Sequence, residues 1–562
     1  MHHRGPIRLA LALFILAETT ACKPEDGDSA PRPDLVCPGD PSCPDEGEAV
    51  LYAGAAMRDV TPEIVDYQSV DANGNSQFEP PPLGDDEWFD GNGNGEWDFV
   101  YIAGLGNPRP ARDVHDPITS RVLVLRWKST TIAIVSLDLI GYFASDIADI
   151  REAVSDLDID FVSVSSTHNH EGPDTVGIWG MDEAWPGWRQ EFFDTIGAGT
   201  EAAIREAYEN MVPAQVTYNQ VAADSHPTRG ICNVQSDGRP PVIFAEDLTV
   251  LHFTGRDGAE AIGTLVHFTA HPESSDDHHQ SLSADFVYWL RMGIEDGIDR
   301  GDTLMPGLSG TAVFIQGPVG SQIGPGDVIC EDLDGTVISE KGFALAECIG
   351  WNLAKIALEA VDTGEGPEQE VPLEVRAQRI ELPVENYGYH AMMLSNIFHR
   401  DDVHGFDDTR PASVDNLPWI WTEVSWLRIG RAQAIGLGGE PNPEIFFGGY
   451  DGSRTPACAR EMLDLDMTTL SQPDNENPPD LSLAPGPPYM FDRLENADFP
   501  MAWAVTNDML GYLIPEYNYI LARPGAYITE APGEHYEETN SVGENAWPII
   551  RAHLVDMLTW RP

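Results

Sequence analysis

Two histidines separated by one residue are the first feature of this sequence that could do chemistry. Residues 167–173 read THNHEGP, which places His168 and His170 at alternate positions. In an extended chain, alternate side chains point to the same side, so both imidazoles can reach one metal ion or one reacting group. A turn with two hydrogen-bonded histidines could have the same sequence. The motif alone leaves both interpretations open.

Apolar stretches that resemble strands come directly before these and other polar residues. Residues 161–166 (FVSVSS) precede His168, residues 261–269 precede His271, and residues 432–437 precede Glu440. A glycine-rich loop with Ser321 follows a further stretch, 311–316. Active sites of α/β proteins collect their groups from several strand ends, so we expect these side chains to meet.

Hydrophobic periodicity alternates between strand and helix along most of the chain. It predicts helices at 146–157, 192–208, 341–361 and 547–560, and further strands at 121–127, 131–137, 248–253, 370–382, 423–429 and 503–507. We therefore predict an α/β fold with mixed β-sheets flanked by helices, in a single large domain that spans residues 49–562.

His168, His271 and Glu440 are the residue types of a catalytic zinc site. Two imidazoles and a carboxylate leave coordination positions open for water and substrate. Zinc would lower the pKa of that water and polarise a carbonyl group, so hydrolysis would need no covalent nucleophile. The segment 276–279 (DDHH) is another source of ligands, but no apolar strand presents it. We interpret it as solvated surface at the rim.

Two acidic loops near the start of the domain have the pattern of calcium ligands. Each places oxygen-bearing side chains at alternate positions, has glycines that let the chain curl, and ends in a carboxylate. An insertion at about 68–100 would contain both, with these predicted calcium ligands: Asp71, Asn73, Asn75, Glu79, Asp90, Asn92, Asn94 and Asp98. A pair of Asn-Gly turns is the alternative interpretation.

The N-terminus has the features of an export signal. Basic residues precede a short apolar run, and small residues precede Cys22, so residues 1–22 resemble a lipoprotein-type signal peptide. We expect a lipidated Cys22 on an exported bacterial lipoprotein, at the outer membrane, the cell surface or in the periplasm; ordinary secretion is the alternative. Residues 23–48, rich in Pro and acids, are predicted to be a disordered tether.

The remaining cysteines agree with export. Six remain besides Cys22, an even number that favours disulfides outside the cell. Cys37–Cys43 and Cys330–Cys348 are the expected local pairs. Their connectivity does not follow from the sequence.

The charge balance excludes one class of partner. The 562-residue chain has 92 acidic and 32 basic residues, a formal charge of −60. Nucleic-acid binding is therefore not expected, because phosphates would be repelled.

Four motifs, taken in order, resemble the neutral/alkaline ceramidase family, zinc amidases that hydrolyse the N-acyl bond of ceramide. The family has a strand that ends in Thr-His-Thr-His-Ser-Gly-Pro, a later strand that ends in His before Pro or Gly, a Pro-Gly-Glu turn, and two late tyrosines. The matching positions here are 167–173, 270–272 with 283–285, 438–441, Tyr512 and Tyr536. The resemblance covers about residues 50–560.

This resemblance implies a site. The zinc ligands would be His168, His271, Glu440 and Tyr512, while His170, Arg229 and Tyr536 would line the site and move protons or bind the carbonyl oxygen. The family's serine near the metal corresponds to Ile323 here, and Ser321 could replace it only in a rearranged loop. The C-terminal immunoglobulin-like domain of characterised ceramidases is not expected in this chain.

We therefore expect a zinc-dependent amidohydrolase that cleaves an N-acyl amide, such as a ceramide-like lipid, with a zinc-bound water. The alternatives are a zinc hydrolase of another amide or ester, or an inactive calcium-binding surface lipoprotein. Trp179, Trp185 and Trp188 follow the histidine motif and could line an apolar groove, or simply pack in the core. Glu171 stands where the family has serine, so it is a candidate for altered specificity.

Overall fold

The computed structural model describes residues 30–106, 108–181, 185–258 and 260–562. The predicted signal peptide and Cys22 lie outside these residues. Within them, no helix combines the length and the apolar character needed to cross a membrane.

A nine-stranded mixed sheet forms the larger half of the fold. Its central strands are buried along nearly their whole length, so both faces of the sheet are covered there. In spatial order its strands are β15 (Thr311–Gln316), β11 (Ala261–Phe268), β10 (Asp247–Gly255), β9 (Val212–Ala222), β2 (Leu51–Asp59), β6 (Thr119–Trp127), β7 (Thr130–Leu137) and β8 (Phe161–Ser166), and β18 (Glu365–Glu368) also pairs with β9. Most neighbours are antiparallel, but β7–β8 and β11–β15 are parallel.

A five-stranded sheet packs against the larger one. Its order is β1 (Leu35–Cys37), β19 (Leu373–Pro383), β20 (Trp419–Ile429), β21 (Ala432–Leu437) and β23 (Phe499–Trp503). Five two-stranded pairs complete the β-structure: β3 (Tyr67–Val70) with β4 (Glu87–Phe89), β5 (Asp113–Val114) with β12 (Ser281–Leu282), β13 (Gly297–Arg300) with β14 (Thr303–Pro306), β16 (Cys330–Glu331) with β17 (Val337–Ile338), and β22 (Glu440–Pro441) with β24 (Tyr512–Leu513).

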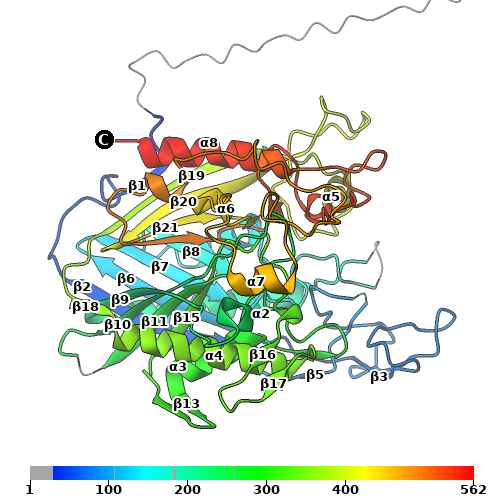
Figure 1. Cartoon of the computed structure of the whole chain (residues 1–562), viewed down its shortest axis with the longest axis horizontal. Helices are drawn as coiled ribbons and strands as arrows, with labels where there is room; N and C mark the ends of the chain where they lie inside the picture. Colours follow the sequence, from blue (N-terminus) through cyan, green and yellow to red (C-terminus); the bar gives the residue numbers. More distant parts are fainter. Residues whose placement is uncertain (1–29, 107, 182–184, 259) are drawn as a thin grey trace, which may run out of the picture.

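The described residues form eight helices, of which the longer ones cover the outer faces of the two sheets. They are α1 (Ala144–Ala153), α2 (Gln190–Glu209), α3 (Phe286–Asp296), α4 (Phe343–Asp362), α5 (Tyr387–Leu394), α6 (Glu444–Phe447), α7 (Ala457–Met462) and α8 (Ala546–Thr559). Figure 1 shows α8 on one side of the molecule, then the smaller sheet, the larger sheet, and α3 and α4 on the other side. One apolar core lies between the sheets and others lie under the helices. The predicted α/β class is confirmed.

The larger sheet curls until strands near its two edges approach each other. Ser136 of β7, next to the edge strand β8, donates from Oγ to the carbonyl of Phe314 in β15 at the opposite edge (2.6 Å). Gln316 at the end of β15 donates to the carbonyl of Thr167, just after β8 (2.8 Å). The curl therefore brings the ends of β8, β11 and β15 to one place.

The predicted tether differs from the structure over its described part. Leu35–Cys37 forms strand β1, which pairs antiparallel with β19. A disulfide between Cys37 and Cys43 closes the following turn, and Asp34 accepts a hydrogen bond from the backbone of Arg379 (2.9 Å). These contacts order residues 30–48, so a disordered segment was the wrong prediction there.

Disulfides join three pairs of cysteines. The predicted Cys37–Cys43 and Cys330–Cys348 pairs are confirmed. The third, Cys232–Cys458, links residues 226 apart in sequence, a distance that no local spacing rule predicts.

Candidate active site

The turn that carries His168 and His170 is held from several directions. His168 has a φ of +65°, a region that residues other than glycine adopt rarely and mostly where the surroundings impose it. The backbone N–H groups of Thr167 and Asn169 donate to Leu137 and Leu139, and that of His170 donates to the carbonyl of Pro272 (3.0 Å). Strain of this kind is often found where a functional group must point in one direction.

His271 follows β11, and a glutamine joins its loop to the first one. Gln316 donates from Nε2 to the carbonyls of both Thr167 and Ala270, each at 2.8 Å. Gln316 is fully buried, so these bonds set the spacing of the two loops. The sequence analysis missed this residue, although its position at the end of β15 was a signal.

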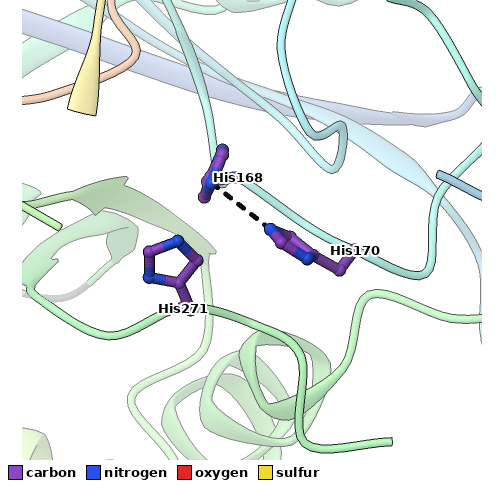
Figure 2. A group of neighbouring side chains, drawn as sticks. All are labelled: His168, His170 and His271. Atoms are coloured by element: carbon purple, nitrogen blue, oxygen red, sulfur yellow. Dashed lines mark hydrogen bonds between the residues drawn. The ribbon is translucent and has the colours of Figure 1, made fainter. Parts of the chain in front are cut away.

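Three imidazoles converge between the two loops. His168, His170 and His271 are all buried and place nitrogen atoms within 4.8 Å of one another. Figure 2 shows the rings of His168 and His170 from one loop facing His271 from the other. Glu440 adds a carboxylate: its Oε2 lies 3.1 Å from His168 Nε2 and 3.5 Å from His271 Nε2.

The hydrogen bonds of His168 and His271 identify which nitrogen faces the centre. His168 Nδ1 lies 2.8 Å from the carbonyl of Ile140, and His271 Nδ1 lies 2.9 Å from the carbonyl of Gln322. A carbonyl only accepts, so both Nδ1 atoms carry a proton and both Nε2 atoms point at Glu440. Backbone partners of this kind orient most metal-binding histidines.

These donors fit a zinc ion. Zinc bonds of ~2.0–2.2 Å in a tetrahedral site place neighbouring donor atoms about 3.3–3.5 Å apart, close to the distances between Glu440 Oε2 and the two Nε2 atoms. Glu440 Oε2 and His271 Nε2 are buried and have no hydrogen-bond partner among the described residues. Two neutral imidazoles and one carboxylate also match a catalytic zinc site with an open position.

The protonation states agree with this fit. Burial raises the pKa of Glu440, but interactions with His168 and His271 outweigh it and lower the pKa to about 2. Burial lowers the pKa of His271, but Glu440 and Glu273 outweigh burial and raise it. Without a metal, a proton would therefore compensate the carboxylate, and a bound cation would displace that proton.

His170 has a different environment, because a second carboxylate faces its ring. Its Nε2 lies 3.3 Å from His168 Nε2, and its Nδ1 lies 3.4 Å from Glu273 Oε2. Burial raises the pKa of Glu273, and burial with the neighbouring His168 and His271 lowers the pKa of His170. The pair is therefore favoured in its uncharged form, a protonated carboxyl beside a neutral imidazole. Glu273 was missed by the sequence analysis.

Two tyrosines complete one side of the site. Strands β22 and β24 pair so that Glu440 is opposite Tyr512, and the Tyr512 hydroxyl lies 2.7 Å from that of Tyr536. Burial and the nearby Glu440 raise the pKa of both phenols well above its usual value, so both hydroxyls keep their protons. They can therefore donate hydrogen bonds to a substrate oxygen.

Two other predicted site residues have their side-chain contacts with other groups. Arg229 lies 3.9 Å from Glu331. The hydroxyl of Ser321 contacts Asp237 (3.4 Å) and accepts from Gln322 Nε2 (3.0 Å). Neither side chain has a contact with the three histidines.

A buried arginine, Arg109, lies near the histidine loop. The sequence pattern did not identify it as a site residue. Arg109 donates to the carbonyls of Ala103 (3.1 Å) and His170 (3.0 Å), and its Nη1 lies 3.0 Å from Glu171 Oε2. His279 Nε2 lies 3.1 Å from the same oxygen. Glu171 is thus fixed under the loop by two partners. The interpretation of 276–279 as solvated surface or rim applies to His278, whose side chain is 81% exposed, whereas the side chain of His279 is 14% exposed.

An apolar pocket of about 200 Å³ opens beside the cluster. His168, His170, Glu440, Tyr512 and Tyr536 lie on one side of it. The apolar side includes Ile140, Phe143, Val176, Trp179, Tyr389, Phe398 and Met509. Trp179, Trp185 and Trp188 were expected to line an apolar groove or to pack in the core. Trp179 lines this pocket, Trp188 packs against Phe193, and Trp185 is exposed.

The two acidic loops have one common design. The first carboxylate, Asp71 or Asp90, accepts hydrogen bonds from backbone N–H groups of its own loop. Two asparagine amides then donate to the last carboxylate: Asn73 and Asn75 to Glu79, and Asn92 and Asn94 to Asp98. All eight predicted ligands are therefore grouped as expected, four to a loop.

Comparison with known proteins supports the fold. No protein-family model matches the chain, and no curated protein matches it in sequence. Solved structures with a similar fold include a neutral ceramidase from Pseudomonas aeruginosa (TM-score 0.58, 14% identity, 91% of this chain and 74% of that chain) and a structure described as ceramidase complexed with C2 (TM-score 0.57, 13% identity, 91% and 75%). The chain therefore has a ceramidase-like fold, built around a buried cluster of three histidines.

Proposed function

We propose that this protein is a zinc-dependent hydrolase that cleaves an N-acyl amide bond. One observation supports this most strongly: two oriented Nε2 atoms and an ionised carboxylate converge beside an apolar pocket. The ceramidase-like fold agrees with the reaction type. We propose His168, His271 and Glu440 as zinc ligands, with Tyr512 beside Glu440 as the fourth.

Zinc, when bound, would polarise the substrate carbonyl and lower the pKa of a nearby water molecule. Tyr536 remains protonated and would donate a hydrogen bond to the oxygen that gains negative charge. His170, with Glu273 behind its Nδ1, would take a proton from water and return it to the amine. Water oxygen bonds to the acyl carbon, the C–N bond breaks, and a carboxylic acid and an amine are released.

Metal analysis and a substrate screen test this proposal together. We expect about one zinc per chain, and hydrolysis of N-acyl amides that is lost in His271→Ala and Glu440→Ala. The screen should include N-acyl amino acids, ceramides and simple esters. If simple esters are cleaved faster than every amide, the proposed substrate class changes from amides to esters. If the protein binds no zinc, or binds zinc and cleaves none of these compounds, the proposal that it is a zinc-dependent hydrolase is contradicted.

We also propose that the loops 71–79 and 90–98 each bind calcium. Their carboxylates and amide oxygens provide the oxygen donors that calcium prefers. A calcium-dependent rise in melting temperature that is lost when Asp71 and Asp90 are both replaced by alanine is the expected result. No change in the wild-type protein at millimolar calcium would refute the proposal.

Lipidation at Cys22 and export of the chain are proposed from the N-terminal sequence. Three disulfides agree with an oxidising compartment. Labelling with a radioactive fatty acid in a bacterial host should mark the wild-type protein and not Cys22→Ser. Equal labelling of both, or of neither, would contradict lipidation.

A further inference from the structure

The apolar pocket beside the histidine cluster has a fixed floor. The ring of Phe398 packs against Phe143 (centroids 5.7 Å apart) and against Tyr389 (5.0 Å). Phe143 and Phe398 are both buried and belong to one of the cores of the protein. Because packed core rings have few alternative positions, the pocket cannot lengthen in this direction without disrupting that core.

A buried ion pair supports these rings from the other side. The guanidinium of Arg400 lies over the face of Phe143 (5.1 Å) and bonds to both oxygens of Asp508 (2.7 and 3.0 Å). Arg400 and Asp508 are almost fully buried. Moving Phe143 would therefore expose or separate a buried charge pair, which is costly.

A second, larger cavity lies directly behind this floor. It has a volume of about 650 Å³, and its lining includes Ala144, His399 and Asn507. Phe143, Phe398 and Met509 line the smaller pocket. Each lies within two residues of one of these three in the sequence. Arg400 lines the larger space and lies over the ring of Phe143, which lines the smaller pocket, so Phe143 and its packing partner Phe398 form the partition between the two spaces.

We propose that the pocket receives the acyl chain of the substrate and limits it to about six to eight carbon atoms. An apolar cavity of ~150 Å³ holds one benzene ring, and this pocket, at about 200 Å³, is one third larger. The substrate class is therefore a medium-chain N-acyl amine, not a long-chain lipid. This inference depends on the proposed amide hydrolysis at the same site.

A series of N-acyl amides with one amine and chains of two to sixteen carbons tests the limit. Each methylene that enters the pocket should raise kcat/KM about fourfold, because its removal from water stabilises the bound state. The rise should stop at about eight carbons, and longer chains should gain nothing or lose activity. A continued rise to sixteen carbons would overturn the inference and leave amide hydrolysis intact.

Binding of the acid products separates this inference from the proposed function. In isothermal titration of the zinc-loaded protein, octanoate should bind more tightly than butanoate and at least as tightly as dodecanoate. If no amide is cleaved at any length, the proposed function fails, while this order of affinities still supports the pocket limit. Tighter binding of dodecanoate in proportion to its extra methylenes would refute it.

Replacing Phe398 tests the partition directly. Phe398→Ala should join the two cavities and raise the ratio of kcat/KM for twelve-carbon to eight-carbon substrates at least tenfold. Phe446→Ala is a matched control, since Phe446 is fully buried in the same core and does not line the pocket; it should leave the ratio unchanged. Phe398→Leu, a milder change, serves if the alanine variant does not fold. An unchanged ratio in a folded Phe398 variant would contradict the partition.

Discussion

Replacing His170 by alanine separates two roles for this ring, zinc ligand and proton carrier. All three imidazoles are close enough to hold one ion. Glu440 Oε2, however, lies within 3.5 Å of the Nε2 atoms of both His168 and His271, whereas His170 already has a carboxylate, Glu273, at its Nδ1. We therefore propose proton transfer for His170 and metal binding for the other two histidines.

The two roles predict different losses of zinc affinity and of kcat. Loss of a group outside the ligand shell typically lowers metal affinity or activity by about 10–100-fold, and loss of a general acid–base costs about 10²–10⁴ in rate. We expect His170→Ala to bind zinc within about tenfold of the wild type and to lose at least about 100-fold in kcat. His271→Ala should lose more than about 100-fold in zinc affinity.

Competition for zinc with a chromophoric chelator measures the affinities, and amide hydrolysis at saturating zinc measures kcat. Circular dichroism of each variant confirms that it folds. Glu273→Gln is the matched control, since it keeps the size of the side chain that faces His170; zinc affinity should stay and kcat should fall. If His170→Ala loses zinc as completely as His271→Ala does, the assignment is refuted and the site is a three-histidine centre.

Three further predictions concern stability. Arg291 forms a buried bidentate pair with Asp138 (2.8 Å for each bond), so Arg291→Met should cost about 3–5 kcal/mol in urea unfolding; a loss below 1 kcal/mol would show that the pair is dispensable. Burial raises the pKa of Asp174 from 3.8 to about 6, so the folded state holds this proton more tightly than the unfolded chain. The resulting stability is full below pH 4 and lost as the pH rises through 6, by about 3 kcal/mol; Asp174→Asn should lack this slope, and an equal slope in both proteins would contradict the assignment. Calcium at about 100 times its Kd should add about 2.7 kcal/mol for each occupied loop, measured by thermal unfolding with magnesium as the control, and an equal gain in the variant lacking Asp71 and Asp90 would place the ion elsewhere.

Local sequence patterns predicted the strands that carry the site because those strands are apolar and end abruptly in polar residues. Strands β8, β11 and β21 lie at 161–166, 261–268 and 432–437, almost as predicted. Helix α3 (Phe286–Asp296) was missed. Its sequence begins with the aromatic and β-branched residues FVYW, which favour strands, and its start depends on Asp285, whose side chain caps the first backbone N–H. Packing against α4 overrides that local preference.

Contacts between distant segments could not be predicted in the same way. The site depends on buried polar residues such as Gln316, Glu273 and Arg109, which no hydrophobic period identifies. Strand β1 was not predicted, for a related reason. A Pro-rich acidic composition indicates disorder, but three residues that pair with β19 and one disulfide are enough to order the segment.

The curl of the larger sheet explains why chemistry develops at this point of the fold. His168 follows the edge strand β8, and His271 follows β11, which is second from the opposite edge. In a flat sheet these residues would be separated by six inter-strand spacings, about 30 Å at the usual distance. Closure of the sheet, visible in the Gln316 bonds to both loops, replaces that distance with rings whose centroids lie 4.7 Å apart. A change that loosens this closure, such as Gln316→Leu, should therefore reduce zinc affinity, although the side chain of Gln316 bonds only to the backbone of Thr167 and Ala270 and not to a proposed zinc ligand. Unchanged zinc affinity in a folded Gln316→Leu variant would show that the histidine loops hold their positions without Gln316.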